Sequence, residues 1–281
     1  MGSLRDKTMP YKTAPLGARV IAITSGKGGV GKSNLVVNVA VELVRRGHRV
    51  AIFDADLGMA NAEVILGLVP RYTLYDYLFN NKEIKDILEV SPQGVYLISG
   101  GSGSVELANL DLSARKRLND GLQELDRLFD FVLVDTGAGI SKTVLGFVAA
   151  AEEVLVVLTP EPTSLTDAYG LIKVLSKYHV HDQIMVVVNR AGNEKEARKT
   201  YQTMETTAKR FLQVQLTYLG FIPDDNTVVQ AVKRQQPFIL MAPGSVASQG
   251  VIRIVNKLLL GQEEEPRGIH SFFGKLMRLF G

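Results

Sequence analysis

The stretch Gly26-Lys27-Gly28-Gly29-Val30-Gly31-Lys32-Ser33 matches the phosphate-binding pattern G-x-x-x-x-G-K-[ST] at every position. An apolar run at 19–25 precedes it and an amphipathic segment at 34–46 follows it, which predicts a strand, a loop and a helix in that order. Glycines allow backbone N–H groups to approach phosphate oxygens, and the helix that begins near Lys32 adds the positive end of its dipole. The stretch therefore predicts a site for the phosphates of a nucleotide.

Two side chains of this loop have predictable roles. Lys32 can reach the outer phosphates, and the Ser33 hydroxyl can be a ligand of Mg²⁺. The predicted nucleotide-binding residues of the loop are Gly28, Gly29, Val30, Gly31, Lys32, Ser33 and Asn34. The alternative is a chance match in a glycine-rich loop, and the flanking strand and helix argue against it.

The composition is that of an ordinary globular protein and excludes several kinds of site. The 281 residues are 46% hydrophobic and 22% charged, with a formal net charge of +3. The absence of cysteine excludes disulfides, thiolate-bound zinc and iron–sulfur clusters. No apolar run approaches the roughly 18 residues of a membrane span, and residues 1–17 lack the apolar centre of a signal peptide. We therefore expect a cytoplasmic protein.

Apolar runs alternate with helical patterns along most of the chain. The expected strands are Val20–Thr24, Val50–Asp54, Val95–Ser99, Phe131–Asp135, Val154–Thr159, Ile184–Asn189 and Leu216–Ile222. The expected helices are Lys32–Arg46, Leu112–Leu128, Lys142–Ala151, Ser164–Tyr178, Glu194–Leu212, Val228–Arg234 and Ser245–Leu260. This alternation predicts an α/β fold with a doubly wound, mostly parallel sheet flanked by helices, and with its ligand at the carboxyl ends of the strands.

Carboxylates follow two of the expected strands. Asp54 and Asp56 end the second strand at spacing i, i+2, which places both on one face. Asp135 follows the apolar run 132–134, as in a Walker B motif, whose carboxylate holds Mg²⁺ through water. We predict a metal site formed by Ser33, Asp54 and Asp135. The alternative is that Asp54 and Asp56 merely cap the turn that follows the strand.

Lys27 is a second lysine in a loop that needs only one. With this lysine, the stretch 26–33 resembles the deviant Walker A motif of the SIMIBI-class MinD/ParA ATPases. The resemblance implies a P-loop ATPase that uses ATP/ADP and Mg²⁺ and forms a homodimer in the ATP state. It implies that Lys27 reaches the partner's nucleotide and that Asp56 orients or deprotonates the attacking water, so that Lys27, Lys32 and Asp56 are the catalytic residues. The alternative for Lys27 is a solvated loop lysine.

The same resemblance implies an adenine site at the ends of two later strands. Asn189 and Arg190 end one strand, and Pro223 and Asp224 end another. In the family, the residue at Asn189 reads the edge of the base, and the backbone beyond Pro223 accepts a hydrogen bond from its amino group. Proline followed by aspartate is also a general turn signal, which is the alternative for that segment.

The chain beyond Leu260 predicts a second functional element. We expect a flexible segment at 1–18 and a MinD-like ATPase domain at 19–260. Residues 261–268 are typical of a solvated linker, and an amphipathic helix is predicted at 269–281. The apolar face of this helix consists of Ile269, Phe272, Phe273, Leu276, Met277 and Phe280. With Lys275 and Arg278 beside this face, the helix suits an anionic membrane surface. The alternative is a helix docked on its own core or on a partner protein.

Several segments are similar to those of the FlhG group (also called FleN or YlxH), which regulates flagellar number and placement. These segments are 54–63, 66–68, 70–74, 135–141 and 159–169. The resemblance implies the GTPase FlhF and the flagellar switch (C-ring) proteins as partners. Many members carry an N-terminal D-Q-A-x-x-L-R motif that stimulates FlhF. Residues 1–17 contain only the Leu-Arg part of this motif, at Leu4-Arg5.

Three other functions remain open. Division-site placement by a MinD-type ATPase predicts the same biochemistry. A ParA-type ATPase that segregates DNA needs an exposed stripe of Lys and Arg and has no use for an apolar tail, so we do not expect nucleic-acid binding. A metabolic P-loop enzyme needs a substrate pocket and has no need for Lys27.

Overall fold

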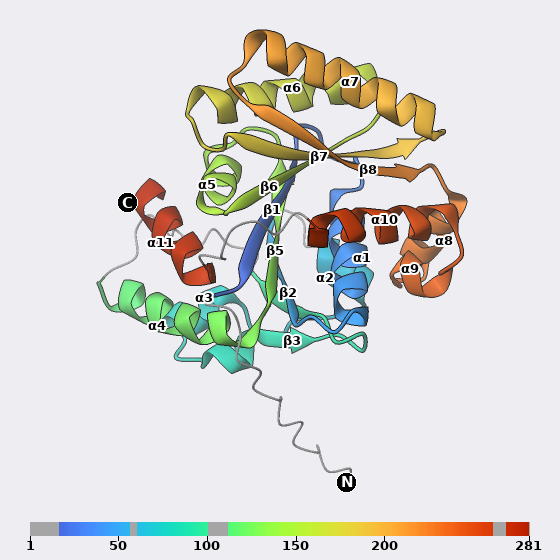
Figure 1. Cartoon of the computed structure of the whole chain (residues 1–281). Helices are drawn as coiled ribbons and strands as arrows, with labels where there is room; N and C mark the ends of the chain where they lie inside the picture. The colour runs from blue at the N-terminus through green and yellow to red at the C-terminus, as the bar shows by residue number, and fades with distance from the viewer. Residues whose placement is uncertain (1–16, 57–60, 101–111, 261–267, 281) are drawn as a thin grey trace.

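The computed structural model describes residues 17–56, 61–100, 112–260 and 268–280. In this part of the chain, eight strands form one sheet in the order β3-β4-β2-β5-β1-β6-β7-β8. Neighbouring strands are parallel except for β3 and β4, which are antiparallel. Helices pack on both faces of the sheet (Figure 1). The predicted α/β fold with a doubly wound, mostly parallel sheet is therefore confirmed.

The elements are named in chain order. The strands are β1 (Arg19–Ser25), β2 (Val50–Ala55), β3 (Leu88–Val90), β4 (Tyr96–Ser99), β5 (Phe131–Ala138), β6 (Glu153–Leu158), β7 (Gln183–Ala191) and β8 (Gln215–Pro223). The helices up to β7 are α1 (Lys32–Arg45), α2 (Asn61–Leu66), α3 (Leu74–Phe79), the 3₁₀ helix η1 (Ile84–Ile87), α4 (Leu112–Leu128), α5 (Lys142–Ala150) and α6 (Pro162–Lys177). The later helices are α7 (Glu194–Phe211), α8 (Asn226–Lys233), α9 (Phe238–Met241), α10 (Val246–Leu260) and α11 (Gly268–Phe280).

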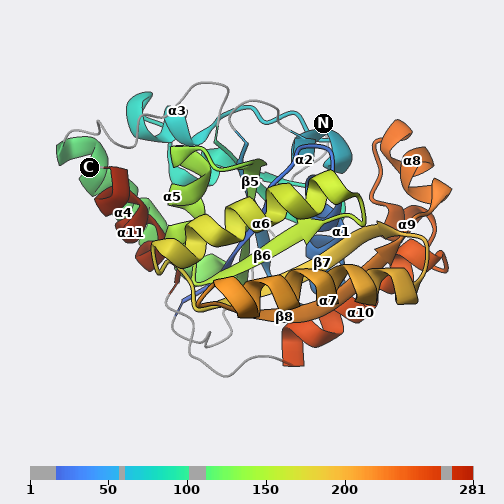
Figure 2. The same ribbon diagram turned by 90° about the horizontal axis from the view of Figure 1, so that it is seen from above.

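Alternating side chains of the strands fill two hydrophobic cores. In β1, Val20 and Ala22 face a core shared with α3 to α7 and α11. Ile21 and Ile23 face the opposite core, shared with α1, α2 and α8 to α10. Figure 1 shows α6 and α7 above β7 and β8 and α1 and α10 below them, and in Figure 2, seen from above, α6 and α7 lie in front. Because both faces are covered, the strands are apolar on both sides, as the continuous Val, Ile and Leu runs predict.

The strand register gathers the polar strand ends at one edge of the sheet. In the pairing of β2 with β5, Asp54 lies directly opposite Asp135. In the pairing of β7 with β8, Asn189 lies opposite Ile222, and Ala191 lies opposite Pro223. The loop at 26–31 leaves the same end of β1 and leads into α1. This edge is where a doubly wound sheet binds its ligand.

All seven expected strands and all seven expected helices are present, with bounds that differ by a few residues. The expectation lacks β3, α2, α3, η1 and α9, which have three to six residues each. Segments of this length span too few residues to show a period of 2.0 or 3.6. They cluster after β2 and β8, so the missed structure lies mainly in the connections.

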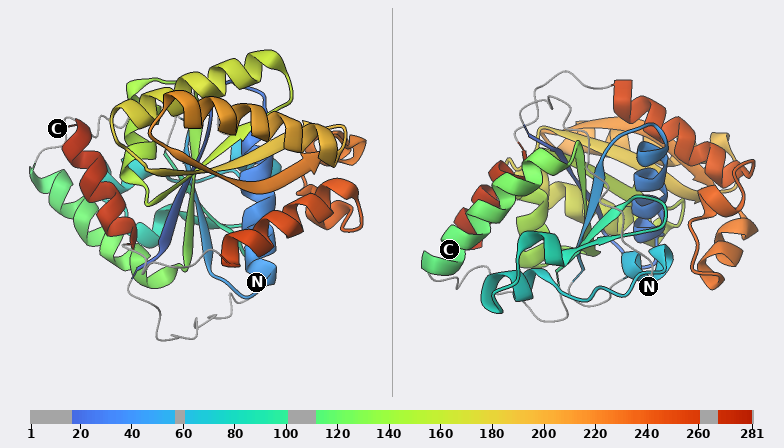
Figure 3. Two further views of the ribbon diagram at one scale, coloured as in Figure 1. Left: turned by 45° about the horizontal axis from the view of Figure 1, so that its top comes forward. Right: turned by 90° about the horizontal axis from the view of Figure 1, so that it is seen from below.

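Helix α11 packs against the body of the protein. It contacts α4 and α5 (Figure 3). It begins at Gly268, which the sequence analysis assigns to the linker, while the rest of that linker and the N-terminal segment 1–16 lie outside the described residues. Within the described part of the chain, the helices are too short or too polar to cross a membrane.

Candidate nucleotide-binding site

The glycine-rich loop has the backbone shape of a phosphate cradle. Gly29 and Gly31 have φ angles of 75° and 88°, a conformation that favours glycine. Gly31 also precedes α1, and the backbone N–H of Leu35 donates to its carbonyl (3.0 Å). Gly28 and Gly29 are exposed, and within the described chain an added Cβ on either would meet no atom within 4 Å. The backbone here is open for close approach by an anion.

Two other glycines of the loop are needed for packing. A Cβ on Gly26 would lie 2.2 Å from the backbone carbonyl carbon of Asp167 in α6. A Cβ on Gly31 would lie 2.3 Å from Nδ2 of Asn189, and this amide nitrogen donates to the carbonyl of Val30 (2.7 Å). The two ends of the loop are therefore held by α6 and by the end of β7, two contacts that the sequence analysis does not predict.

Lys32 and Asp135 form a buried ion pair beneath the loop. Lys32 Nζ lies 2.5 Å from Asp135 Oδ1, and the side chains are 8% and 0% exposed. Burial raises the pKa of Asp135, while the Lys32 ammonium and the Ser33 hydroxyl oppose the rise. The structure thus brings together Lys32, Ser33 and Asp135, three residues that the sequence assigns to phosphate and Mg²⁺.

Asp54 adds a second buried carboxylate next to Asp135. The pKa of Asp54 is raised to about 7, mainly by burial and then by the Asp135 and Glu63 carboxylates, while the Asp56 N–H and Lys32 act to lower it. Its Oδ1 accepts from the backbone N–H of Asp56 (3.1 Å). In the described chain, Asp54 Oδ2 and Asp135 Oδ2 are buried without a hydrogen-bond partner. Two such oxygens beside the open loop fit a hydrated Mg²⁺ bound with phosphate.

Asp56 is half-buried and lies next to the last residues of β5. A Cβ on Gly137 would lie 3.7 Å from Asp56 Oδ1, so the carboxylate and the end of β5 are neighbours. The chain directly after β5 is bound to the end of β1, because the backbone N–H of Gly139 donates to the carbonyl of Ser25 (2.8 Å). Residues 57–60, which follow Asp56, lie outside the described residues. The structure thus places Asp56 beside Asp54 and the end of β5.

Lys27 points away from the buried cluster. Its Nζ lies 3.0 Å from Glu161 Oε2 and 2.9 Å from Thr163 Oγ1, at the start of α6. The lysine side chain is 38% exposed and that of Glu161 is 58% exposed, so this ion pair contributes little to stability. In the single chain, Lys27 is therefore held by Glu161 and Thr163 at the start of α6. The sequence analysis does not name these two partners.

The four predicted adenine-site residues lie side by side at the ends of β7 and β8. Asn189 Nδ2 donates to the loop carbonyl of Val30, and Asn189 Oδ1 accepts from the backbone N–H of Arg190 (3.0 Å). An amide has two N–H groups and two oxygen lone pairs, so Asn189 retains one of each. Arg190 is exposed, with a φ of 57°, and the backbone N–H of Asp224 donates to the carbonyl of Ala191 (3.0 Å). The arrangement joins the predicted base site directly to the phosphate loop.

Helix α11 turns its apolar face inward. Ile269, Phe272, Phe273 and Leu276 are at most 2% exposed, and Met277 is half-buried. The ring of Phe273 packs on Phe53 of β2 (centroids 5.5 Å apart), and that of Phe272 packs on Phe147 of α5 (6.2 Å). The face expected to contact a membrane is thus covered by the protein's own core in this structure, as in the alternative of a docked helix. A hydrophobic face is compatible with either partner, so its pattern alone cannot choose between them.

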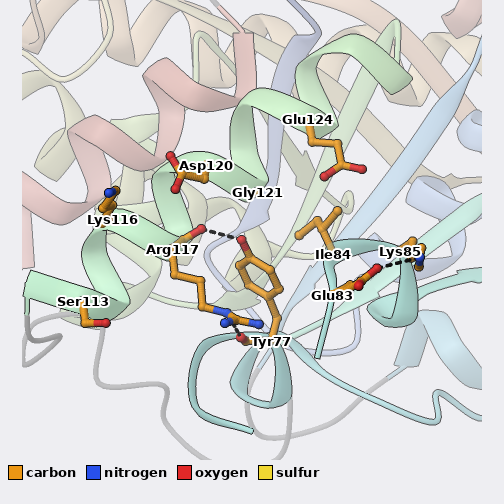
Figure 4. A pocket seen from close by; sticks show the side chains of 10 residues that line it. All are labelled: Tyr77, Glu83, Ile84, Lys85, Ser113, Lys116, Arg117, Asp120, Gly121 and Glu124. Atoms are coloured by element: carbon orange, nitrogen blue, oxygen red, sulfur yellow. Dashed lines mark hydrogen bonds and ion pairs between the residues drawn. The ribbon is translucent and has the colours of Figure 1, made fainter. Parts of the chain in front are cut away.

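A surface cleft of the described chain lies away from the predicted nucleotide-binding residues. A cavity of about 480 Å³ lies between α3, η1 and α4 (Figure 4). Arg117 spans it, and its guanidinium donates to the carbonyls of Tyr77 (2.6 Å) and Lys82 (2.5 Å). None of the predicted nucleotide-binding residues lines this cavity. Its arginine serves to hold the end of α3 against α4.

The chain is similar to known nucleotide-binding proteins. Residues 21–238 match the family described as CobQ/CobB/MinD/ParA nucleotide binding domain. The chain is 40% identical over 256 residues to the antiactivator FleN of Pseudomonas aeruginosa, which covers 91% of each chain. It is 37% identical over 272 residues to the flagellum site-determining protein YlxH of Helicobacter pylori, which covers 94% of this chain and 91% of that protein.

The fold is also similar to that of a solved structure that contains a bound nucleotide. The septum site-determining protein MinD from Pyrococcus horikoshii, complexed with Mg-ADP, has a TM-score of 0.68 and 26% sequence identity. The comparison covers 88% of this chain and 99% of that one. Because the family match spans residues 21–238 and FleN is 40% identical over 91% of each chain, this chain belongs to the MinD/ParA family of nucleotide-binding ATPases.

Proposed function

We propose that this chain is a dimerising switch that hydrolyses ATP slowly, binds the membrane as the ATP dimer and regulates the number and placement of flagella. The observation that carries the proposal is the 40% identity to FleN across 91% of the chain, together with the second lysine of the P-loop. YlxH, named for determining the flagellar site, supports the same process. In this proposal the chain is cytoplasmic and associates peripherally with the inner face of the cytoplasmic membrane.

The nucleotide would lie on the loop at 28–34, where the exposed backbone at Gly28 and Gly29 approaches the phosphates. Lys32 would turn from Asp135 to the outer phosphates, which leaves the Asp135 carboxylate free to hold Mg²⁺ through water with Ser33 and Asp54 around it. The metal, when bound, neutralises charge that develops on the phosphate oxygens. Asp56, half-buried beside the cluster, would orient or deprotonate the attacking water.

Dimerisation would give Lys27 its role. To reach a partner's nucleotide, the ammonium must leave Glu161 and Thr163, and both contacts are at an exposed surface where little energy is lost. A cation supplied in trans stabilises the charge of the transition state and couples hydrolysis to assembly. Slow turnover by the monomer and faster turnover by the dimer follow from this arrangement.

Membrane binding would require α11 to leave the body. Burial of each large apolar side chain contributes about 1.5–3 kcal/mol, so the docked helix is stable in water until another apolar surface replaces the core. A single amphipathic helix of this length binds a bilayer weakly, and two helices in a dimer bind more tightly through avidity. The proposal therefore links the ATP dimer to membrane residence through the number of helices presented.

A deletion strain of the organism that encodes this chain tests the process. Flagella and minicells are counted in the same cells by microscopy. Altered flagellar number or position with normal division supports the flagellar role. Minicells with ordinary flagella would instead support the second candidate, a MinD-type division-site ATPase, which the similarity to the MinD of Pyrococcus horikoshii favours. A ParA-type DNA-segregation role is the least supported and would appear as a salt-dependent gel shift with DNA.

Pelleting with anionic liposomes tests the mechanism. We expect the full chain to pellet with ATP and to remain in solution with ADP, and a chain truncated at Gly268 to remain in solution with either nucleotide. Equal pelleting in ADP, or pelleting by the truncated chain, would contradict the proposed switch. The GTPase FlhF and the flagellar switch proteins are proposed partners, to be tested by binding assays with purified components.

A further inference from the structure

One carboxylate, that of Asp126 in α4, holds backbone N–H groups from both ends of the described chain. Its Oδ1 accepts from the N–H of Ala18 (3.3 Å) and from that of Ile269, and its Oδ2 accepts from the N–H of His270 (3.0 Å). Ala18 directly precedes β1, whereas Ile269 and His270 lie in the first turn of α11. Asp126 therefore joins α4, the entry to the central strand and the start of the C-terminal helix.

The contact with α11 is favourable for electrostatic reasons. The first N–H groups of a helix have no partner within the helix, and they carry the positive end of its dipole. The half-buried carboxylate of Asp126 supplies both the acceptors and the negative charge. Hydrogen bonds to a charged group contribute about 1.5–3 kcal/mol, more than those between neutral groups. Asp126 is thus a polar anchor at one end of an otherwise apolar contact.

Gly268, at the start of α11, packs closely against the Asp126 carboxylate. Its φ angle is 83°, which disfavours any residue with a side chain. A Cβ at this position would also lie 2.6 Å from Oδ2 and 2.7 Å from Oδ1 of Asp126. Gly274, in the same helix, is different, because within the described chain an added Cβ there meets no atom within 4 Å. The helix therefore contains one glycine that the contact requires and one that it does not.

We propose that Asp126 is a positioning residue that sets how readily α11 leaves the body, and that it couples this release to the start of β1. When the carboxylate loses the first turn of α11, it also loses the group that orients its Oδ1 toward Ala18. Release of the C-terminal helix then loosens the chain where the N-terminal segment enters the sheet. The inference rests on the proposed function only for the use of the released helix; the docking itself is tested without a membrane.

Hydrogen–deuterium exchange on the full chain, without lipid, measures the docking directly. Asp126→Ala and Gly268→Ala should speed exchange in peptides covering 269–280 and 17–20 by roughly tenfold or more, the effect of losing charge-assisted hydrogen bonds. Asp126→Asn, which keeps one acceptor oxygen and loses the charge, should give a smaller increase. The matched controls are Asp120→Asn, an exposed carboxylate on the same helix, and Gly274→Ala, and both should exchange at the wild-type rate or more slowly.

The proposal is overturned if Asp126→Ala and Gly268→Ala both exchange like the wild type. If Asp126→Ala does not fold, Asp126→Asn and Gly268→Ala decide the result. Faster exchange at 269–280 with no change at 17–20 would overturn the coupling to β1. Pelleting with phosphatidylglycerol vesicles separates the proposed membrane binding from the proposed role of Asp126. We expect Gly268→Ala to pellet in ADP. If the wild type with ATP and Gly268→Ala both fail to pellet, membrane binding is wrong, and the exchange result still decides the role of Asp126.

Discussion

Asp54 and Asp135 occupy directly opposed positions on the parallel strands β2 and β5, and both carboxylates are buried. Burial and the neighbouring Asp135 raise the pKa of Asp54 from 3.8 to about 7. A carboxyl whose pKa is raised by folding stabilises the folded state while it is protonated. Its contribution is fully present below pH 3.8 and is lost as the pH rises through about 7.

We therefore expect the nucleotide-free protein to lose stability between pH 4.5 and pH 7, relative to Asp54→Asn, by an amount on the order of 3 kcal/mol. Asparagine has the shape of the protonated acid and does not ionise, so the difference between the two proteins isolates this group. Urea denaturation at a series of pH values, in the absence of Mg²⁺, measures it. A difference that does not change with pH would show that Asp54 is already ionised at pH 4.5 in the folded protein.

The glycines of the phosphate loop should separate into two classes. Gly26→Ala places a Cβ 2.2 Å from backbone atoms of α6, which cannot move aside as a side chain can, so we expect a loss of stability of more than about 2 kcal/mol. Gly28→Ala meets open space in the described chain and should leave the stability of the protein within about 0.5 kcal/mol. It should nevertheless weaken ATP binding, because the Cβ occupies the approach of the phosphates.

Thermal denaturation and nucleotide titration of the two variants test this division. Equal destabilisation by both substitutions would mean that the loop does not pack on α6 as described. Unchanged ATP affinity in Gly28→Ala would place the phosphates elsewhere. Each variant is the control for the other, since both make the same chemical change in the same loop.

Most of the sheet and the phosphate loop can be predicted from the sequence because their signals are local. The loop at 26–33 has a fixed spacing, and the strands have long apolar runs. Partners that are distant in the chain have no such signal. The contact of Gly26 with α6, the hydrogen bond from Asn189 to Val30 and the pairing of Lys27 with Glu161 join residues more than 130 positions apart. These contacts are fixed by the fold and not by any spacing.

The C-terminal helix shows a different limit. The positions of Ile269, Phe272, Phe273 and Leu276 predict one apolar face, and the structure has that face. The hydrophobic effect has no direction, so the same face is stabilised by a membrane or by a protein core. Docking on α4 and α5 also depends on the Asp126 anchor, a polar contact between distant parts of the chain that no helical period reveals.

The two lysines of the loop should differ in what their loss affects. Lys32 lies beneath the loop, 8% exposed, and Lys32→Ala should abolish ATP binding because it removes the cation closest to the phosphates. Lys27 points toward α6, and Lys27→Ala should leave ATP affinity within a few-fold while lowering turnover by roughly a thousandfold, as expected for a cation that acts in trans. Steady-state hydrolysis at several protein concentrations, with a fluorescent nucleotide titration, measures both. Wild-type turnover in Lys27→Ala would show that this lysine takes no part in hydrolysis.

Two residues in α11 test whether the helix is docked in solution. Phe272 is 1% exposed and packs on Phe147, so Phe272→Ala should lower the free energy of unfolding by about 3–5 kcal/mol through the cavity it creates. Leu279 is 55% exposed in the same helix, and Leu279→Ala should change the free energy of unfolding by about 0.5 kcal/mol or less. Chemical denaturation without lipid compares the two variants with the wild type. A free helix would make both substitutions equally harmless, because neither side chain would then be packed in the folded state.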